Sequence, residues 1–387
     1  MTNDRSDDRG TDCDATVLTP GGRGAVTTVR FDGASRQLDT AELFRAANGR
    51  PVASQPIDRI VFGWWGAGVP EEVVLCRTSQ TTIEIHCHGG TAAVARVLDD
   101  LQQIGCRVSS WQESTRRSRG LFETELIEAL TQATTSRTAG ILLEQQSGLL
   151  RNCLRELLDA DLFATAEGRG NLECRLAGLL EWADFGRHLT RPWRVVLAGR
   201  PNVGKSSLIN ALVGYTRAIV HEQPGTTRDL VTAEVAIDGW PVLLTDMAGI
   251  RATSDRLESA GIERARSQLD SADCRLILID VSRSPHHEDL QLLADWPEAI
   301  HVAHKSDLPD VWGARISATA VPVSSVTGEG VETLTATLIA RLVRRVPAAG
   351  TPIPVSERQT TLLRAALDAV RRVDRSAWKE TLRDCLR

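Results

Sequence analysis

One loop constrains the fold of this chain more than any other stretch. Residues 199–206 read GRPNVGKS, which matches the phosphate-binding pattern G-x-x-x-x-G-K-[ST]. An apolar, β-branched segment precedes the loop at 193–198, and a helix-forming segment follows it at 207–213. Strand, glycine loop and helix in this order predict a P-loop. In such a loop backbone N–H groups surround the phosphates, Lys205 reaches the outer phosphates, and the Ser206 hydroxyl can hold Mg²⁺.

The composition is that of an ordinary globular chain, and it narrows the classes of function. The 387 residues leave room for two or three domains, and 42% of them are hydrophobic. A net charge of −5 argues against a strongly basic nucleic-acid clamp. The eight cysteines are scattered and form no C-x-x-C pair, so we expect reduced thiols. The polar start lacks the apolar core of a signal peptide, and no run is long enough to span a membrane. A cytoplasmic location and no membrane partner are therefore expected.

The order of apolar patterns predicts a multidomain protein that combines an α/β domain with α+β and helical parts. The helical patterns on either side of the α/β segment predict one helical domain into which the α/β domain is inserted. The expected segments are a disordered tail (1–14), an α+β domain (15–118) with strands at 25–31 and 82–86 and a helix at 89–104, a first helical part (119–190), the P-loop domain (191–346) and a second helical part (347–387).

Two polar motifs downstream of the P-loop predict the rest of a phosphate and metal site. The first, PGTTRDL at 224–230, offers Thr226 and Thr227 to Mg²⁺ and the terminal phosphate. Strand patterns at 231–237 and 241–244 flank Asp238-Gly239, a two-residue hairpin turn. The hairpin leads into DMAG at 246–249. There Asp246 can bind the Mg²⁺ water shell, and the Gly249 backbone N–H can sense the terminal phosphate.

The motif HKSD at 304–307 predicts the base that the site binds. It follows a buried strand at 300–303, and Asp307 can accept hydrogen bonds from both N1–H and N2–H₂ of guanine. Adenine cannot satisfy that pairing, so a guanine nucleotide is favoured over an ATP-type ligand. Lys305 can lie over the base plane, and the Ser325 backbone N–H can contact the guanine oxygen. His304 stands where the usual pattern has Asn or Thr. When that residue is Asn, its side-chain amide braces the P-loop and the base. We therefore expect GTP preference to persist with weaker affinity.

These elements together predict a Ras-like P-loop GTPase domain. Its expected nucleotide-binding residues are Asn202, Val203, Gly204, Lys205, Ser206, Ser207, Thr226, Thr227, Asp246, Gly249, Lys305, Asp307, Ser324 and Ser325, with Ser206 and Thr227 on Mg²⁺.

The residue that activates water is not evident from the motifs alone. Ras-like switches place a Gln directly after D-x-x-G, but this chain has Ile250 there. Glu258 and Glu263 are candidate bases, and spacing does not separate that role from one of solvated helix carboxylates. Among other clusters, alternation in a strand disfavours a metal at His86-Cys87-His88. The basic cluster at 116–119 is predicted to be a solvated loop rather than a tRNA contact.

Longer segments match one family. They are GRPNVGKSSLINAL, PGTTRDL, DMAGIR, DRLESAGIERA at 255–265, TPGGRGAV at 19–26 and EIHCHGG at 84–90. On these residues the chain resembles the MnmE (TrmE) tRNA-modification GTPases. The resemblance is strong over 193–335, recognisable over 15–100 and thin in the helical parts.

The resemblance implies an architecture and partners. It implies an N-terminal folate-binding and dimer-forming domain, a discontinuous helical domain, and a GTPase domain inserted into it. Glu258 then matches the general base that acts when two GTPase domains meet in a homodimer. Asn202 matches a residue that holds K⁺ in place of an arginine finger. A formyl-tetrahydrofolate site is implied near Arg23, Arg30 and His88. A GidA (MnmG)-type flavoprotein is the implied partner in adding an aminomethyl-type group to the wobble uridine of tRNA.

Departures from the family leave a second hypothesis open. The family ends in C-I-G-K, whereas this chain ends in Asp384-Cys385-Leu386-Arg387 and reads as C-terminally shortened. The family stretch F-x-N-G-K-x-D-L-x-Q-A-E is also altered at 119–129, and Met247 replaces a usual family residue. The alternative is a divergent paralogue that acts as a regulatory GTP switch or assembly factor without modifying tRNA.

Overall fold

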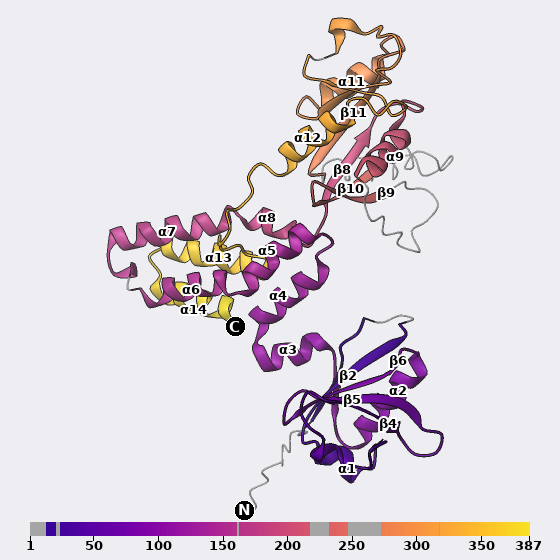
Figure 1. Cartoon of the computed structure of the whole chain (residues 1–387). Coiled ribbons are helices and arrows are strands. Elements are labelled where there is room, and N and C mark those ends of the chain that lie inside the picture. Colours follow the sequence, from indigo (N-terminus) through magenta and orange to yellow (C-terminus); the bar gives the residue numbers. More distant parts are fainter. Residues whose placement is uncertain (1–12, 21–23, 161, 217–231, 247–271, 317) are drawn as a thin grey trace, which may run out of the picture. The chain divides into compact units, whose positions relative to one another are not determined.

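A computed structural model describes residues 13–20, 24–160, 162–216, 232–246, 272–316 and 318–387 (Figure 1). The chain forms two compact units, residues 1–124 and 125–387. Every cysteine lies in the described part as a free thiol, which agrees with the expectation from the sequence. None of the described helices is both long and apolar enough to cross a membrane.

A seven-stranded sheet organises the described part of the first unit, in the order β3-β4-β5-β6-β2-β1-β7. Neighbouring strands are antiparallel, except for the parallel pair β1 and β7. The strands and helix predicted near 25–31, 82–86 and 89–104 are confirmed. The elements are β1 (Asp14–Val17), β2 (Val26–Asp32), α1 (Arg36–Thr40), β3 (Phe44–Ala46), η1 (Val52–Ser54), β4 (Ile60–Trp65), β5 (Glu71–Arg77), β6 (Thr82–His88), α2 (Thr91–Gln103), β7 (Arg107–Ser109) and α3 (Trp111–Arg119).

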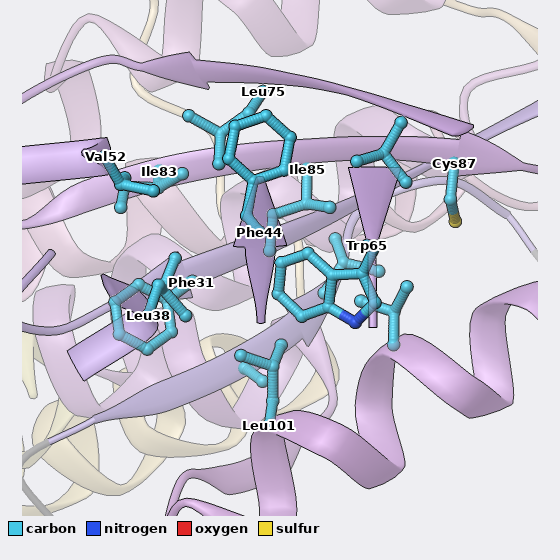
Figure 2. Packing of buried hydrophobic residues seen from close by; sticks show 14 of the residues in the cluster. Phe31, Leu38, Phe44, Val52, Trp65, Leu75, Ile83, Ile85, Cys87 and Leu101 are labelled. Carbon is cyan, nitrogen blue, oxygen red and sulfur yellow. The ribbon is translucent and has the colours of Figure 1, made fainter. Parts of the chain in front are cut away.

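The core of this unit comes from strict alternation along its strands. Phe31 of β2, together with Ile83 and Ile85 of β6, points to the same side as Trp65 of β4. Figure 2 shows these side chains gathered above α2, which contributes Leu101. Because strand side chains alternate between faces, the residues between them lie on the other face of the sheet. Arg30 and His88 are on that second face.

Helix α3 corrects one expectation from the sequence. The basic residues Arg116, Arg117 and Arg119 were expected in a solvated loop, but they lie in the last turns of α3. A capping box starts the helix: the Ser110 hydroxyl accepts from the Glu113 N–H, and the Glu113 carboxylate accepts from the Ser110 N–H. Cations at the carboxyl end of a helix interact favourably with its dipole, so the basic cluster itself stabilises a helix here.

Helices make up two separate stretches of the second unit. The first contains α4 (Leu121–Gln132), which crosses the unit boundary, α5 (Ser136–Gln146), α6 (Leu149–Asp159), η2 (Leu162–Ala164), α7 (Ala166–Leu180) and α8 (Ala183–Arg187). The second contains α13 (Glu357–Arg371) and α14 (Arg375–Leu386). Helix α13 packs against α7, and α14 packs against α6, so the two stretches share one core (Figure 1).

In the chain between these stretches, the described residues form a six-stranded sheet in the order β13-β12-β11-β8-β10-β9. All neighbours are parallel except β9 and β10, which form the hairpin predicted around Asp238-Gly239. Both turn residues have positive φ, 50° and 75°, as a tight two-residue turn requires. The elements are β8 (Trp193–Ala198), α9 (Lys205–Thr216), β9 (Thr232–Ile237), β10 (Trp240–Asp246), β11 (Cys274–Asp280), α11 (His287–Asp295), β12 (Ile300–His304), η4 (Gly313–Arg315), β13 (Val321–Val323) and α12 (Val331–Leu342).

Candidate nucleotide site

The P-loop (199–206) connects the carboxyl end of β8 to the first turn of α9, as the sequence predicted. Two of its residues have left-handed backbone: Asn202 has φ of 61° and Gly204 has φ of 102°. Glycine at 204 is also a steric requirement, because a Cβ there would lie 2.4 Å from the His304 ring. The loop is therefore shaped by residues outside its own sequence.

Lys205 is folded back over the P-loop. Its side chain is buried, and Nζ donates to the carbonyl oxygens of Gly199 and Arg200, each at 3.0 Å. This places the ammonium inside the curve of the loop, where a phosphate chain binds in proteins with this motif. Within the loop the Val203 side chain is buried, whereas Asn202 and the following Ser207 are exposed.

Ser206 and Asp246 meet at the edge of the sheet. The Ser206 hydroxyl donates to the Asp246 carboxylate at 2.8 Å, although the two residues come from α9 and the end of β10. Strands β8 and β10 are parallel neighbours, so their carboxyl ends bring P-loop and aspartate together. Asp246 is 2% exposed. A hydroxyl and a carboxylate are hard oxygen donors of the type that Mg²⁺ prefers, so this pair fits that ion.

Lys305 is held by an aspartate that the sequence motifs did not single out. Its Nζ donates to Asp280 at 2.6 Å and to the Asn202 carbonyl oxygen at 3.3 Å. Burial alone would raise the pKa of Asp280, but hydrogen bonds from Lys305 and Ser282 outweigh it and lower that pKa. Part of the signal was available in the sequence, because Asp280 ends a buried strand as Asp246 does, but only the structure shows that this strand lies next to β8.

His304 joins two loops of the site. Its Nδ1 lies 2.8 Å from the Val203 carbonyl oxygen, and its Nε2 lies 2.7 Å from the Ser325 hydroxyl. The following loop is shaped by Ser324, whose hydroxyl accepts from the N–H groups of Val326 and Thr327. Asp307 is exposed after β12. The two motifs predicted to surround the base thus lie on adjacent parallel strands, β12 and β13.

A second interaction missed by motif analysis anchors the start of the P-loop. The Arg200 guanidinium lies 3.3 Å from Glu288 and 3.6 Å from the buried Asp289, both in the first turn of α11. Acidic residues in a first helical turn are common, so their spacing in the sequence carries no sign of this contact.

Several predicted site residues fall outside the described residues. They are Arg23, Thr226, Thr227, Gly249 and Glu258, and the alternative base Glu263 also lies there.

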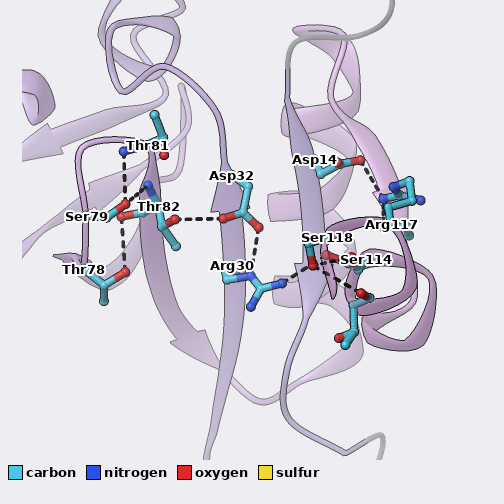
Figure 3. A network of polar contacts seen from close by, with 12 residues as sticks. Asp14, Arg30, Asp32, Thr78, Ser79, Thr81, Thr82, Ser114, Arg117 and Ser118 are labelled. Carbon is cyan, nitrogen blue, oxygen red and sulfur yellow. Dashed lines mark hydrogen bonds and ion pairs between the residues drawn. The ribbon is translucent and has the colours of Figure 1, made fainter. Parts of the chain in front are cut away.

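The remaining folate candidates lie on one face of the sheet in the first unit. Figure 3 shows Arg30 bonded to Asp32 at 2.9 Å and to Ser114 of α3 at 3.0 Å. His88 is exposed and contacts Glu71. Because His88 pairs with Val26, it lies about 13 Å along the sheet from Arg30, at ~3.3 Å per residue. A cavity of about 650 Å³ lies on the opposite face beside α2, and neither residue is among the described residues that line it.

Comparison with known proteins agrees with this geometry. A family model described as "50S ribosome-binding GTPase" matches residues 194–305, which contain the P-loop, the hairpin and the strand ending at His304. The tRNA modification GTPase MnmE of Symbiobacterium thermophilum is 33% identical, over 92% of this chain and 88% of its own length. The protein of that name from Synechococcus sp. (strain CC9605) is 32% identical, over 96% and 92%. The one from Chlorobium luteolum is 33% identical, over 83% and 78%.

Identity at this level over nearly the whole chain agrees with the site, where Lys205 bonds to the P-loop carbonyls and the Ser206 hydroxyl donates to Asp246. The chain is therefore a GTPase and belongs to the family of MnmE tRNA modification GTPases.

Proposed function

We propose that this GTPase couples GTP hydrolysis to modification of the wobble uridine of tRNA, together with a GidA (MnmG)-type flavoprotein. The observation that carries the proposal is the meeting of Ser206 and Asp246 at 2.8 Å beneath the P-loop. These two side chains can hold Mg²⁺ beside the phosphates. The relatives that match most of this chain are named tRNA modification GTPases.

In the proposed site the phosphates bind along the P-loop (199–206). Lys205 would exchange its carbonyl partners for phosphate oxygens, and the N–H groups from Val203 to Ser207 would donate to them. Ser206 and Thr227 would hold Mg²⁺, and Asp246 would bind its water shell. The ion, when bound, neutralises charge on the phosphates. Gly249 and Thr226 would contact the terminal phosphate.

The base would bind between Lys305 and the loop at 324–326. Asp307 is exposed at the end of this strand pair, so its carboxylate is available to N1–H and N2–H₂ of guanine. The Asp280 carboxylate accepts a hydrogen bond from Lys305 Nζ and so holds the ammonium in place. The Ser325 backbone N–H would donate to the guanine oxygen.

Hydrolysis is proposed to need a second copy of the chain and a monovalent cation. Ile250 cannot orient water, so Glu258 is proposed as the general base. Asn202 is proposed as a K⁺ ligand; its exposed side chain and left-handed backbone place it at the rim of the P-loop. Formyl-tetrahydrofolate is proposed as a ligand of the first unit near Arg23, Arg30 and His88, with that unit also forming the homodimer.

The proposed architecture is a GTPase domain (191–346) inserted into a helical domain (119–190 and 347–387), after an N-terminal domain (15–118). The packing of α13 on α7 and of α14 on α6 supports it, because residues on both sides of the α/β segment share one core.

The proposed function is tested by nucleoside mass spectrometry. In a strain that lacks this gene and any second family copy, modified wobble uridines should disappear, and expression of the full chain should restore them. The Lys205→Ala variant should not restore them, because it lacks the ammonium that holds the phosphates. Unchanged modified uridines in the deletion strain would refute the role in tRNA modification.

A further inference from the structure

His304 occupies a fixed position between the two halves of the nucleotide site. It is the last residue of β12 and pairs with Asp280 of β11 on one side and Val323 of β13 on the other. Its side chain is 3% exposed. A residue held in register on both sides has little freedom in its backbone, so its ring is aimed by the sheet.

The partners of the ring determine which nitrogen carries the proton. The Val203 carbonyl oxygen, 2.8 Å from Nδ1, can only accept, so Nδ1 must carry hydrogen and donate. In the neutral ring Nε2 is then an acceptor, and the Ser325 hydroxyl at 2.7 Å donates to it. Both polar atoms of this buried ring are thereby satisfied, as buried polar groups require.

The surroundings favour the neutral ring. Burial lowers the pKa of His304, and the positive charge of Lys305 lowers it further. The Val203 carbonyl and the carboxylates of Asp280 and Asp307 act in the opposite direction without reversing the shift. The ring is therefore neutral near pH 7, with its hydrogen on Nδ1.

The ring also packs against the P-loop itself. A Cβ at position 204 would lie 2.4 Å from His304 Cε1 and 2.7 Å from Nδ1, so the ring fits because residue 204 is glycine. One side chain therefore touches Val203 and Gly204 on the phosphate side and Ser325 on the base side. The hydrogen bonds span 101 residues of chain in one direction and 21 in the other.

We propose that His304 is a positioning residue that ties the P-loop to the base-binding loop through Val203 and Ser325, and so sets the affinity and guanine selectivity of the site. The inference rests on the proposed nucleotide site. It reverses the expectation that losing the usual Asn leaves the P-loop without a brace. If His304 is removed, the Val203 carbonyl and the Ser325 hydroxyl lose their partner, and the two loops are no longer held in one arrangement.

The experiment measures binding of GDP and ADP to the full chain by calorimetry, for the wild type and three variants. His304→Ala should weaken GDP binding about 30-fold and reduce the preference for GDP over ADP about tenfold, in line with two charge-neutral hydrogen bonds lost. The Asn side chain of His304→Asn carries a donor and an acceptor on a short stem. This variant should bind GDP within about threefold of the wild-type affinity. Ser325→Ala removes the hydroxyl but keeps the backbone N–H, and should weaken GDP binding about fivefold.

Coupling separates positioning from a general loss of stability. If His304 acts through Ser325, the double variant His304→Ala/Ser325→Ala should bind GDP no more weakly than His304→Ala alone. Additive losses would overturn the proposed link to the base-binding loop. If His304→Ala does not fold, His304→Phe, which keeps a ring but has no donor or acceptor, takes its place in the same comparison with Ser325→Ala.

The pH profile is a further readout. GDP affinity of the wild type should be constant above about pH 6.5 and fall as the pH drops through the lowered pKa of His304, because a buried charge then forms between the loops. His304→Asn should remove the part of this fall that is due to position 304. Equal GDP affinity and selectivity in wild type and His304→Ala would overturn the inference. Failure of the wild type to bind GDP would instead refute the nucleotide site itself.

Discussion

Three lysines occur in this chain, and two of them lie in the candidate nucleotide site. Lys205 bonds to P-loop carbonyls, and Lys305 bonds to Asp280 and the Asn202 carbonyl. Each ammonium is thus held at a defined place by oxygen atoms of the protein. At the scale of single residues, the candidate site is organised by side chains that contact backbone carbonyls of the P-loop.

Lys205→Ala should abolish tight nucleotide binding. The variant removes a buried ammonium that is positioned for the phosphates, and we expect GTP affinity to fall by roughly 100-fold or more. Titration with a fluorescent GTP analogue measures it. Lys379→Ala on α14 is the matched control, since it removes the third lysine outside the site, and its affinity should equal that of the wild type. Wild-type affinity in Lys205→Ala would contradict the assignment.

Asp280→Asn should destabilise the chain in a pH-dependent way. The Asp280–Lys305 pair is 2.6 Å long and the carboxylate is 11% exposed, so its loss should lower the free energy of unfolding by about 2 kcal/mol near pH 7. The lowered pKa means that the carboxylate stabilises the fold above its ordinary pKa, and that this contribution disappears as the pH falls through the folded value.

Urea denaturation should therefore show a difference between wild type and Asp280→Asn at pH 7 that shrinks below about pH 4. Asp184→Asn is the control: its partner Arg187 and its own carboxylate are exposed, so the change should be close to zero. A difference for Asp280→Asn that grows in acid would show that the sign is wrong.

At the scale of elements, the β9–β10 hairpin links the α/β part of the second unit to its helices. Trp240, at the start of β10, is 1% exposed and meets Phe185 of α8 edge to face at 5.5 Å. The Arg137 guanidinium of α5 lies 4.4 Å from the Trp240 ring and donates to Asp238 at the turn. The Thr135 hydroxyl, which caps α5, also donates to the Gly239 carbonyl. Strand β10 continues from this contact to Asp246.

Trp240→Ala should be strongly destabilising. The change leaves a cavity between hairpin and helices, and we expect the free energy of unfolding to fall by roughly 4 kcal/mol. Arg137→Ala keeps the indole buried and removes a partly exposed cation, so its cost should be about 1 kcal/mol. Chemical denaturation of both variants measures the difference. Equal losses would mean that the hairpin is held by the arginine rather than by apolar packing.

Elements were predicted from the sequence with unequal success. The strands and the Asp238-Gly239 turn follow from alternation and turn chemistry, which are local, and the structure confirms them. Helix α3 was missed because its basic residues were interpreted as a loop, without the capping box that Ser110 and Glu113 form at its start. Both signals are local, but only the cap defines where backbone N–H groups find partners.

At the scale of the whole molecule, the proposed homodimer makes GTP hydrolysis depend on protein concentration. If two GTPase domains must meet, the rate per chain should rise with concentration in K⁺ buffer, and should stay low in Na⁺ buffer at the same ionic strength. Steady-state phosphate release over a range of about 100-fold in concentration measures this. A rate per chain that is independent of concentration and of the cation would contradict the proposal.

Glu258→Ala tests the proposed base in the same assay. The variant should bind GTP as the wild type does, because the carboxylate is proposed to act on water and not on the nucleotide. Its K⁺-stimulated hydrolysis should be lost, by about 100-fold or more if the carboxylate is the general base. Glu263→Ala is the matched control and should retain hydrolysis. Loss of activity in Glu263→Ala alone would assign the base to that residue instead.

The sequence by itself determined the chemistry of this protein: a P-loop, an aspartate ending a neighbouring strand, and a guanine-type motif, each readable because its residues are consecutive. Only the tertiary structure decided how these motifs support one another. The sheet order places β8 beside β10, which brings Ser206 to Asp246, and places β12 beside β11, which brings Lys305 to Asp280. It also sets His304 against Val203 and Ser325. Such contacts depend on which strands are neighbours in the sheet, and the spacing of residues along the chain does not contain that information.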